Sequence, residues 1–288
     1  CIRDSLYGNA VFQKKFMGKS REGDMDDLRS LIKPFILRRL KRDVMKELPD
    51  KIEKKFYVEM TPEQKKVYMT YVGEIRRLMK EKDFGENKIT IFSYLTKLRE
   101  LCLDPSVLVN GYNGGSGKMD VSLDIIRENI GENRKVLLFS QFTSVLKNIG
   151  KMLTKNGIEY YYLDGSTKPE ERIELVNKFN NGEDKKVFLI SLKAGGTGLN
   201  LTSANVVVHF DPWWNPAVED QATDRAHRFG QKNVVQVIKL IAEGSVEDKI
   251  ITLQEDKKEL INKVITGDFK EGGFLKGLSK EDLEELFS

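Results

Sequence analysis

The sequence of 288 residues is poor in the residues that build disulfide frameworks and zinc sites. It has two cysteines, Cys1 and Cys102, which are too few for a disulfide framework and make a reducing compartment the default. No cysteine pair accompanies its two histidines, His209 and His227, so a structural zinc site is not expected. Apolar runs such as Val206–Val208 are far too short to span a bilayer, and no signal peptide is visible.

Complete catalytic motifs are also missing. SGKM (Ser116–Met119) resembles part of a phosphate-binding loop, but Tyr112 stands where the first glycine belongs, and Met119 replaces the Ser/Thr that would hold magnesium. We therefore interpret it as a linker. Asp211 follows an apolar strand but has no acidic neighbour, so we interpret it as a strand-ending residue and not as a magnesium ligand. No G-x-S-x-G elbow is present, which leaves covalent hydrolase chemistry without support.

What the chain does have is a slight excess of positive charge. The formal net charge is +4, and the densest basic cluster is RRLKRD, Arg38–Asp43. Such a cluster is either a solvated helix face or a patch that binds a polyanion. The chain begins with Cys1 and enters an amphipathic pattern directly, so we expect it to be an excised part of a longer protein.

The first part of the chain is predicted to be mostly helical. Apolar residues recur at helical spacing from Asp26 to Glu47, and Lys55–Met60 has the pattern of a short strand. The stretch Thr61–Gln64 predicts a helix start, with Thr as N-cap and Pro at the first helical position. A second helix is predicted from Ile89 to Cys102. The glycine-rich stretch Gly111–Lys118 predicts a flexible joint and a domain boundary.

After this joint, predicted strands alternate with predicted helices. Short runs that are apolar throughout predict strands at residues 135–140, 158–163, 186–191, 205–210 and 234–242. Uniformly apolar strands that alternate with helices indicate a parallel sheet with helices on both faces. A long helix is predicted to follow from Ser245 to Ile265.

A glycine loop follows one of these strands directly. SLKAGGTGLNL (Ser191–Leu201) places Gly195, Gly196 and Gly198 at the carboxyl end of a strand, which is the edge where open parallel sheets bind ligands. The glycines either let the backbone approach a ligand closely or form a tight turn between strand and helix.

Two further motifs follow the next strand, and we expect them at the same sheet edge. In DPWWNP (Asp211–Pro216) we predict that Trp213 packs in the core and that Trp214 is the more exposed of the two. DQATDRAHRFGQ places Arg225 and Arg228 three residues apart on a predicted helix, and therefore on one helical face. The pair is either solvated or directed at an anion.

Taken in order, VLLFSQF, YYLDGSTKPEER, SLKAGGTGLNL, DPWWNP and DQATDRAHRFGQ resemble the second motor lobe of Swi/Snf-type ATPases, which are helicase-like DNA translocases of superfamily two. LIKPFILRRLKRDVMKELPDKIE is similar to the end of the first lobe. TPEQKKVYMTYV and LRELCLDPSVL are similar to the helices before the second lobe. The ending GFLKGLSKEDLEELF is most similar to prokaryotic members. That implies a cytoplasmic, nucleoid-associated protein, whereas a eukaryotic member would be nuclear.

The resemblance implies two RecA-like lobes that close around ATP and Mg²⁺ while both hold duplex DNA. Arg225 and Arg228 match the paired arginine fingers, which neutralise charge on the transferred phosphoryl group. Gly196 and Gly198 match the loop that senses nucleotide, and Gln221 begins the arginine motif at the cleft. ATP with Mg²⁺ would be bound mainly by the first lobe, whose phosphate loop and acidic box are absent from this chain. We therefore expect the chain to be inactive alone.

For DNA, the resemblance implies that Trp214 reaches the minor groove and that Lys193 and Gln141 are candidates for phosphate contact. The expected partners are double-stranded DNA, the first lobe of the same protein and an unidentified DNA-bound protein, with no membrane and no protein-bound structural metal. Two alternatives stay open: a docking module without hydrolysis, or a strand-separating helicase lobe. The expected domains are the end of the first lobe (1–60), a helical protrusion with its joint (61–117), a RecA-like second lobe (118–243), and a brace helix with an acidic tail (244–288).

Overall fold

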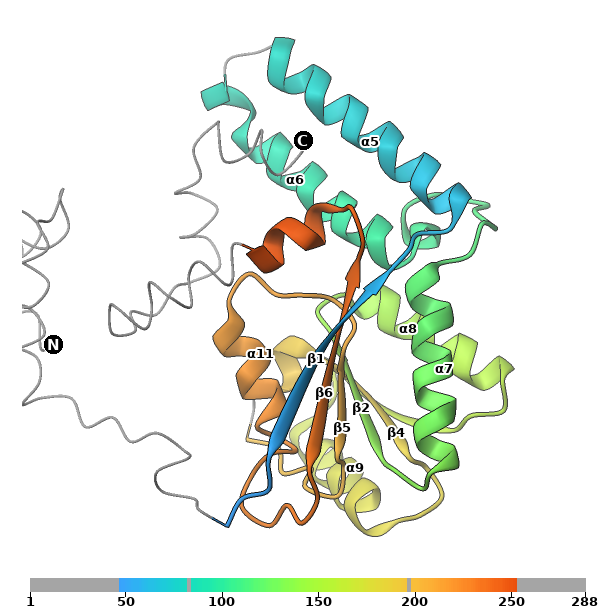
Figure 1. Ribbon diagram of the computed structural model, residues 1–288, viewed down its shortest axis with the longest axis vertical. Helices are drawn as coiled ribbons and strands as arrows, with labels where there is room; N and C mark the ends of the chain where they lie inside the picture. The colour runs from blue at the N-terminus through green and yellow to red at the C-terminus, as the bar shows by residue number, and fades with distance from the viewer. Residues whose placement is uncertain (1–46, 82–83, 196–197, 253–288) are drawn as a thin grey trace, which may run out of the picture. The chain divides into compact units, whose positions relative to one another are not determined.

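A computed structural model of the chain is shown in Figure 1. The structure describes residues 47–81, 84–195 and 198–252, and residues 48–252 of this described part belong to one compact unit. The basic cluster Arg38–Asp43 and nearly all of the predicted helix Asp26–Glu47 lie outside the described residues, as does the chain after Thr252. No helix in the described ranges is long and apolar enough to cross a membrane.

The unit is built on a six-stranded sheet in which all neighbouring strands are parallel, in the order β1-β6-β5-β2-β4-β3. All five strands predicted after the glycine-rich stretch form, and the central strands β2, β4 and β5 are buried on both faces because they are mostly apolar. The strands are β1 (Lys51–Val58), β2 (Val136–Ser140), β3 (Tyr160–Leu163), β4 (Val187–Ser191), β5 (Val206–His209) and β6 (Val235–Ala242).

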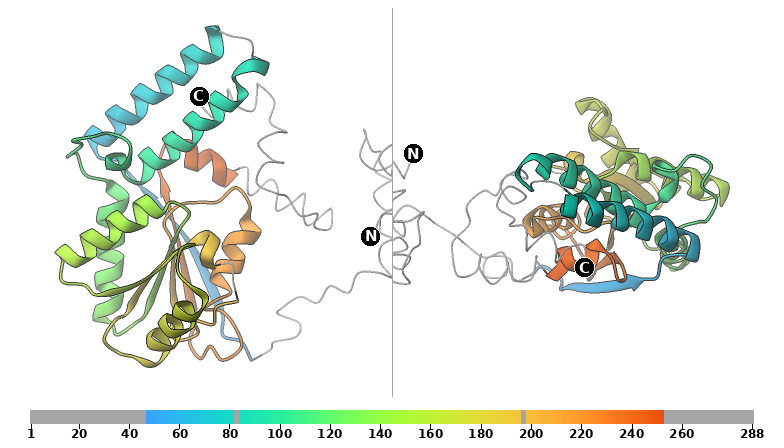
Figure 2. Two further views of the ribbon diagram at one scale, coloured as in Figure 1. Left: turned by 180° about the vertical axis from the view of Figure 1, so that it is seen from behind. Right: turned by 90° about the horizontal axis from the view of Figure 1, so that it is seen from above.

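Helices cover both faces of this sheet (Figures 1 and 2). Helices α7 (Gly117–Gly131) and α8 (Thr143–Lys155) share one hydrophobic core with the strands. Helices α9 (Pro169–Asn181), α10 (Leu192–Gly195) and α11 (Pro216–Thr223) share a second core with the opposite face. This is the predicted RecA-like α/β architecture.

The edge strand β1 comes from a segment well before the predicted range 118–243. It pairs with β6 from Lys51 opposite Val235 to Val58 opposite Ala242. It also begins and ends earlier than the predicted strand Lys55–Met60. The sheet therefore draws one strand from the sequence that precedes the helical region.

A pair of helices, α5 (Pro62–Glu81) and α6 (Phe84–Leu103), projects beyond the carboxyl ends of the strands (Figure 1). The predicted helix start forms a reciprocal cap: Thr61 Oγ1 accepts from Gln64 N at 3.1 Å, and Gln64 Oε1 accepts from Thr61 N at 3.3 Å. The pair encloses a third core with Trp214 and with the helical residues 246–252.

The glycine-rich stretch 111–118, predicted as a flexible joint and domain boundary, makes close contacts with its neighbours in the structure. Ser116 Oγ donates to Leu103 O at 2.5 Å and caps α7, while a Cβ on Gly117 would collide with the carbonyl oxygen of Glu59. Lys118 is fully buried, donates to Phe210 O just after β5 and to Leu240 O within β6, and pairs with Glu247 at 2.5 Å. The glycines allow close packing, and the lysine is a structural cation.

Candidate functional site

The arginine motif follows α11 as a run of turns. Asn215 caps the helix with its side-chain oxygen, and the helix ends at Thr223, so the predicted helix through Arg228 is too long. Beyond Thr223, the main-chain amides of Arg225 and Arg228 bond at 3.1 Å to carbonyls three and two residues before them, so the continuous α-helical ladder is interrupted, although His227 N still bonds to Thr223 O. Residues 224–231 are named the arginine turn below.

The two arginines of this turn lie close enough to repel each other. Arg225 is half-buried and Arg228 is exposed. Burial and then the Arg228 charge lower the pKa of Arg225, against a smaller opposing effect of Asp224. Because a guanidinium remains charged at neutral pH, the turn carries two neighbouring positive charges. Such a pair favours an anion with several acceptor oxygens, such as a phosphate.

Hydrogen bonds hold the arginine turn against the end of the glycine loop. Leu201 N donates to Arg225 O at 2.9 Å. The buried Gln231 side chain donates to Ala204 O at 2.8 Å and to Ala226 O at 3.1 Å. These contacts place the turn beside residues that lead into β5, and not at the carboxyl edge of the sheet where the sequence placed it.

The other residues predicted to contact nucleotide are only partly described. Gly198 is exposed and has a φ of +44°, a conformation that favours glycine. Gly196 lies outside the described residues. Gln221 is exposed near the end of α11. The structure thus brings the stretch after Gly198 next to the arginine turn.

The start of the compact unit also lies beside the arginine turn. His227 Nε2 is 2.7 Å from the carbonyl oxygen of Pro49, and Lys51 Nζ is 3.4 Å from a carboxylate oxygen of Asp220 on α11. The chain that comes from residues 1–47 therefore enters this unit next to the two arginines.

A buried polar network lies between α11 and the sheet. Glu219 pairs with Lys239 of β6 at 2.7 Å and accepts a hydrogen bond from Trp213 N at 2.7 Å. Burial alone would raise the pKa of Glu219, but Lys239, His209 and these hydrogen bonds outweigh it and hold that pKa below its usual value. His209 Nε2 lies 2.9 Å from Thr223 Oγ1, and burial lowers the pKa of His209 to about 4. The ion pair is charged and the imidazole is neutral at pH 7.

Trp214 is the more exposed of the two tryptophans, as predicted, but only by a margin too small to present a surface to solvent. Both tryptophans are buried, Trp213 at 6% and Trp214 at 8% exposure. They do point in different directions, because Trp213 packs in the core beneath α11 while Trp214 packs among the side chains of α5 and α6. The helical pair covers the surface that Trp214 would otherwise present to solvent. Residues 211–215 are named the tryptophan turn below.

Arg99 of α6 joins the helical pair to the tryptophan turn. Its guanidinium donates to Pro212 O at 2.7 Å and to Gln141 Oε1 at 3.2 Å, and it lies 5.3 Å from the Trp214 ring centroid. Gln141 also donates to a carboxylate oxygen of the buried Asp211 at 2.6 Å. Both ends of the Gln141 amide are thus engaged inside the protein, although we predicted this residue as a DNA contact.

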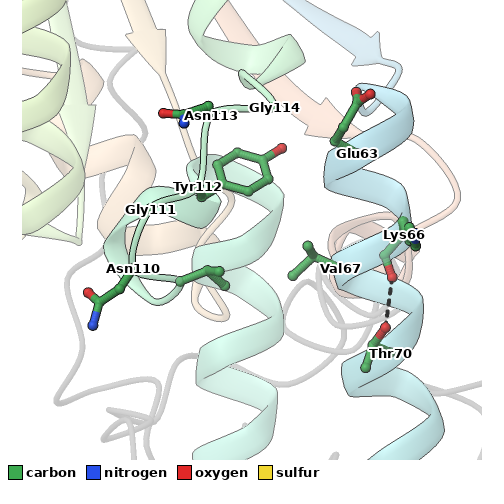
Figure 3. Close-up of a pocket in the computed structure, with 10 residues that line it drawn as sticks. Glu63, Lys66, Val67, Thr70, Asn110, Gly111, Tyr112, Asn113 and Gly114 are labelled. Carbon is green, nitrogen blue, oxygen red and sulfur yellow. Dashed lines mark hydrogen bonds between the residues drawn. The ribbon is translucent and has the colours of Figure 1, made fainter.

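Of the predicted DNA contacts, only Lys193 has an exposed side chain; it lies on α10, directly after β4. A separate open cavity of about 800 Å³ lies between α5 and the loop 109–114. Figure 3 shows the Tyr112 ring between this loop and Glu63 of α5. The cavity shares no residue with either turn. The described residues contain no group of three or more His, Cys, Asp or Glu side chains that could hold a metal ion.

The sequence interpretation missed three residues that hold the two turns in place: Arg99, Glu219 and Gln231. One of them had a visible signal. Arg99 lies four residues after Leu95 and three before Cys102, which are both buried, and a charge within an apolar helical stripe indicates an internal partner. Glu219 and Gln231 carry no such signal, because their partners lie on other strands and loops.

Comparisons with known proteins identify the family and the fold of the chain. Residues 117–230 match the family model described as "Helicase conserved C-terminal domain", and residues 3–107 match "SNF2-related domain". The chain is similar to the "Sulfolobus solfataricus SWI2/SNF2 ATPase C-terminal domain", with 35% identity and a TM-score of 0.68 over 82% of this chain and 98% of that one. It is also similar to the core of that ATPase "in complex with dsDNA", with 34% identity and a TM-score of 0.70 over 97% of this chain and 60% of that one.

Curated relatives are longer than this chain. An "Uncharacterized ATP-dependent helicase" of Mycoplasma pneumoniae is 40% identical over 99% of the chain and 27% of that protein. A "Putative ATP-dependent helicase/translocase YwqA" of Bacillus subtilis is 38% identical over 93% of the chain and 29% of that protein. The chain thus spans little more than a quarter of these relatives.

Proposed function

Because this chain belongs to the SNF2 family of ATPases, we propose that it is the second motor lobe of a DNA-dependent ATPase that translocates along duplex DNA and remodels bound protein. The supporting observation is the arginine turn, whose hydrogen-bonded main chain places the positive charges of Arg225 and Arg228 close to each other. The proposal assigns both arginines to the γ-phosphate of ATP.

In this role the arginines act on charge that develops during hydrolysis. As water attacks the γ-phosphorus and the bond to the β-phosphate oxygen breaks, negative charge accumulates on the phosphoryl oxygens and the leaving group. Arginine fingers that neutralise this charge are worth roughly 10³–10⁵ in rate in phosphoryl-transfer enzymes. The turn suits this task because its main chain is fixed by Leu201 and Gln231, so little reorganisation is needed at the moment of reaction.

The rest of the ATP site is proposed to lie in a first motor lobe. The sequence has no phosphate loop, and the described residues have no acidic cluster suited to Mg²⁺. When bound, Mg²⁺ would neutralise the phosphate oxygens. The entry of the chain beside the arginine turn, through Pro49 and His227, is consistent with a first lobe connected at this point.

DNA is proposed to contact the exposed surface near the carboxyl ends of the strands, where Lys193 lies. The relative solved with double-stranded DNA supports duplex DNA as the partner. Trp214 and Gln141 are engaged inside the protein, so we assign them to the support of this edge and not to direct DNA contact. The bacterial relatives favour a nucleoid location.

The test is phosphate release by the full-length protein with and without duplex DNA, together with a strand-separation assay on a forked duplex. We expect DNA to stimulate hydrolysis and the strands to stay paired. Stimulated hydrolysis with strand separation would instead identify a helicase. No hydrolysis with any nucleic acid would identify a docking module and overturn the proposal.

A further inference from the structure

Glu219 has a carboxylate that connects two separate parts of the lobe. One oxygen accepts a hydrogen bond from Trp213 N in the tryptophan turn at 2.7 Å, and the other lies 2.7 Å from Lys239 Nζ on β6. Glu219 itself belongs to the first turn of α11 and is 1% exposed. A single side chain therefore joins a turn, a helix and a strand without an intervening solvent layer.

The tryptophan turn is fixed from its other side by Arg99, which bonds to Pro212 O and to Gln141. Gln141 follows β2 directly, so the turn is connected to the carboxyl end of a central strand as well as to α6. A displacement of this sheet edge or of the helical pair must therefore displace the tryptophan turn.

On the other side of Glu219, α11 is short and leads directly into the arginine turn. Its last residue, Thr223, is bonded to His209 of β5, and the arginine turn is closed by Leu201 and Gln231. Internal hydrogen bonds thus form a continuous connection from the helix that carries Glu219 to the main chain of Arg225 and Arg228.

We propose that Glu219 is a positioning residue that couples the tryptophan turn to the arginine turn, so that DNA contact at the carboxyl edge sets the position of the two arginines. The inference rests on the proposed function. It goes beyond that function by naming the connection through which DNA would stimulate hydrolysis. In this scheme the hydrogen bond from Trp213 N is the coupling element, and the ion pair with Lys239 only keeps the carboxylate in place.

The bond and the ion pair can be separated by two double variants of the full-length protein. Glu219→Gln/Lys239→Met removes both charges but keeps a carbonyl oxygen that accepts from Trp213 N. Glu219→Leu/Lys239→Met removes both charges and also the acceptor, at similar side-chain volume. Replacing a buried ion pair by groups of similar volume is often tolerated. The readout is the ratio of kcat with saturating duplex DNA to kcat without DNA.

We expect the Gln/Met variant to keep the wild-type ratio, and the Leu/Met variant to lose roughly 5- to 150-fold of it, the range typical of coupling between two sites. Glu174→Gln is the matched control, because Glu174 pairs with Lys178 at the same 2.7 Å but on the exposed surface of α9. It should leave the ratio unchanged. Thermal unfolding of every variant identifies an assay temperature at which all are folded.

Three outcomes would overturn the proposal: equal ratios in the two double variants, a loss of stimulation in the Gln/Met variant, or rates with and without DNA that fall together. If the Leu/Met variant does not fold, the Gln/Met variant decides, since it keeps the acceptor and must keep the ratio. A wild-type protein without DNA stimulation would instead refute the proposed function itself, so the two failures are distinguishable.

Discussion

The two turns at the ends of α11 differ in what covers them. The tryptophan turn is enclosed, with Trp213 and Trp214 buried and with Arg99 and Glu219 bonded to its main chain. The arginine turn is open: Arg228 is exposed, and Phe229 has 76% of its surface exposed. Eight helical residues separate the two turns.

The difference indicates two kinds of function within one strand–helix unit. An enclosed turn whose bonds end on α6, β2 and α11 can transmit a displacement, but it has no surface for a ligand. An open turn with a fixed main chain and two cations has a surface for an anion but cannot complete an anion site alone. We therefore interpret the tryptophan turn as a connection and the arginine turn as half of a site.

The largest expected effect is the loss of ATP hydrolysis when the arginine turn is separated from the rest of the ATP site. The isolated chain of residues 1–288 should hydrolyse ATP no faster than buffer, with or without DNA, because it has no phosphate loop to hold the nucleotide. Phosphate release measures this, and the Arg228→Ala form of the same chain controls for contaminating ATPases. Turnover that disappears in that form would show that the site is complete within this chain.

The next effect compares an aromatic side chain from each turn. Trp214→Ala should lower the free energy of unfolding by about 3–5 kcal/mol, because it leaves a cavity among α5, α6 and residues 246–252. Phe229→Ala removes an exposed ring and should change the free energy of unfolding by no more than about 0.5 kcal/mol. Denaturant unfolding measures both variants. A small loss for Trp214→Ala would restore the prediction that this ring is available to DNA.

The sequence predicts the structure of the two turns to different extents. The central strands were predictable because each is a short, mostly apolar run, a property of the local sequence, as in Val136–Ser140. Arg225 and Arg228 were identified as a charged pair, but the end of α11 at Thr223 was not, because it depends on bonds to Leu201 and Gln231. The burial of Trp214 could not be predicted, since the helices that cover it come from much earlier in the chain.

A smaller effect is the pH dependence of the free energy of unfolding, which tests how α11 packs on the sheet at His209. His209 faces Glu219 and Lys239, and burial lowers its pKa from 6.5 to about 4 in the folded protein. Between these values the unfolded chain binds more protons, so this contribution to stability is complete above pH 6.5 and is lost as pH falls toward 4. It amounts to about 3 kcal/mol.

The measurement is the free energy of unfolding of wild type and His209→Gln from pH 7.5 down to 4, where carboxylates titrate in both proteins. The wild type should lose more stability over this range, and the difference between the two curves isolates His209. Parallel curves would mean that the imidazole is hydrated and that α11 is not packed on the sheet as described.

The central claim is that the arginine turn acts on the γ-phosphate during bond breaking. Its most direct test is Arg228→Ala in the full-length protein, with kcat at saturating DNA and Kd for ATP measured on the same sample. Arg127→Ala serves as control, because that arginine bonds to Asn156 on the exposed surface. We expect kcat to fall by about 10³-fold or more, while Kd stays within about threefold of wild type because ground-state binding does not need the finger. A rise in Kd that matches the fall in kcat would show an ordinary phosphate ligand and contradict the claim.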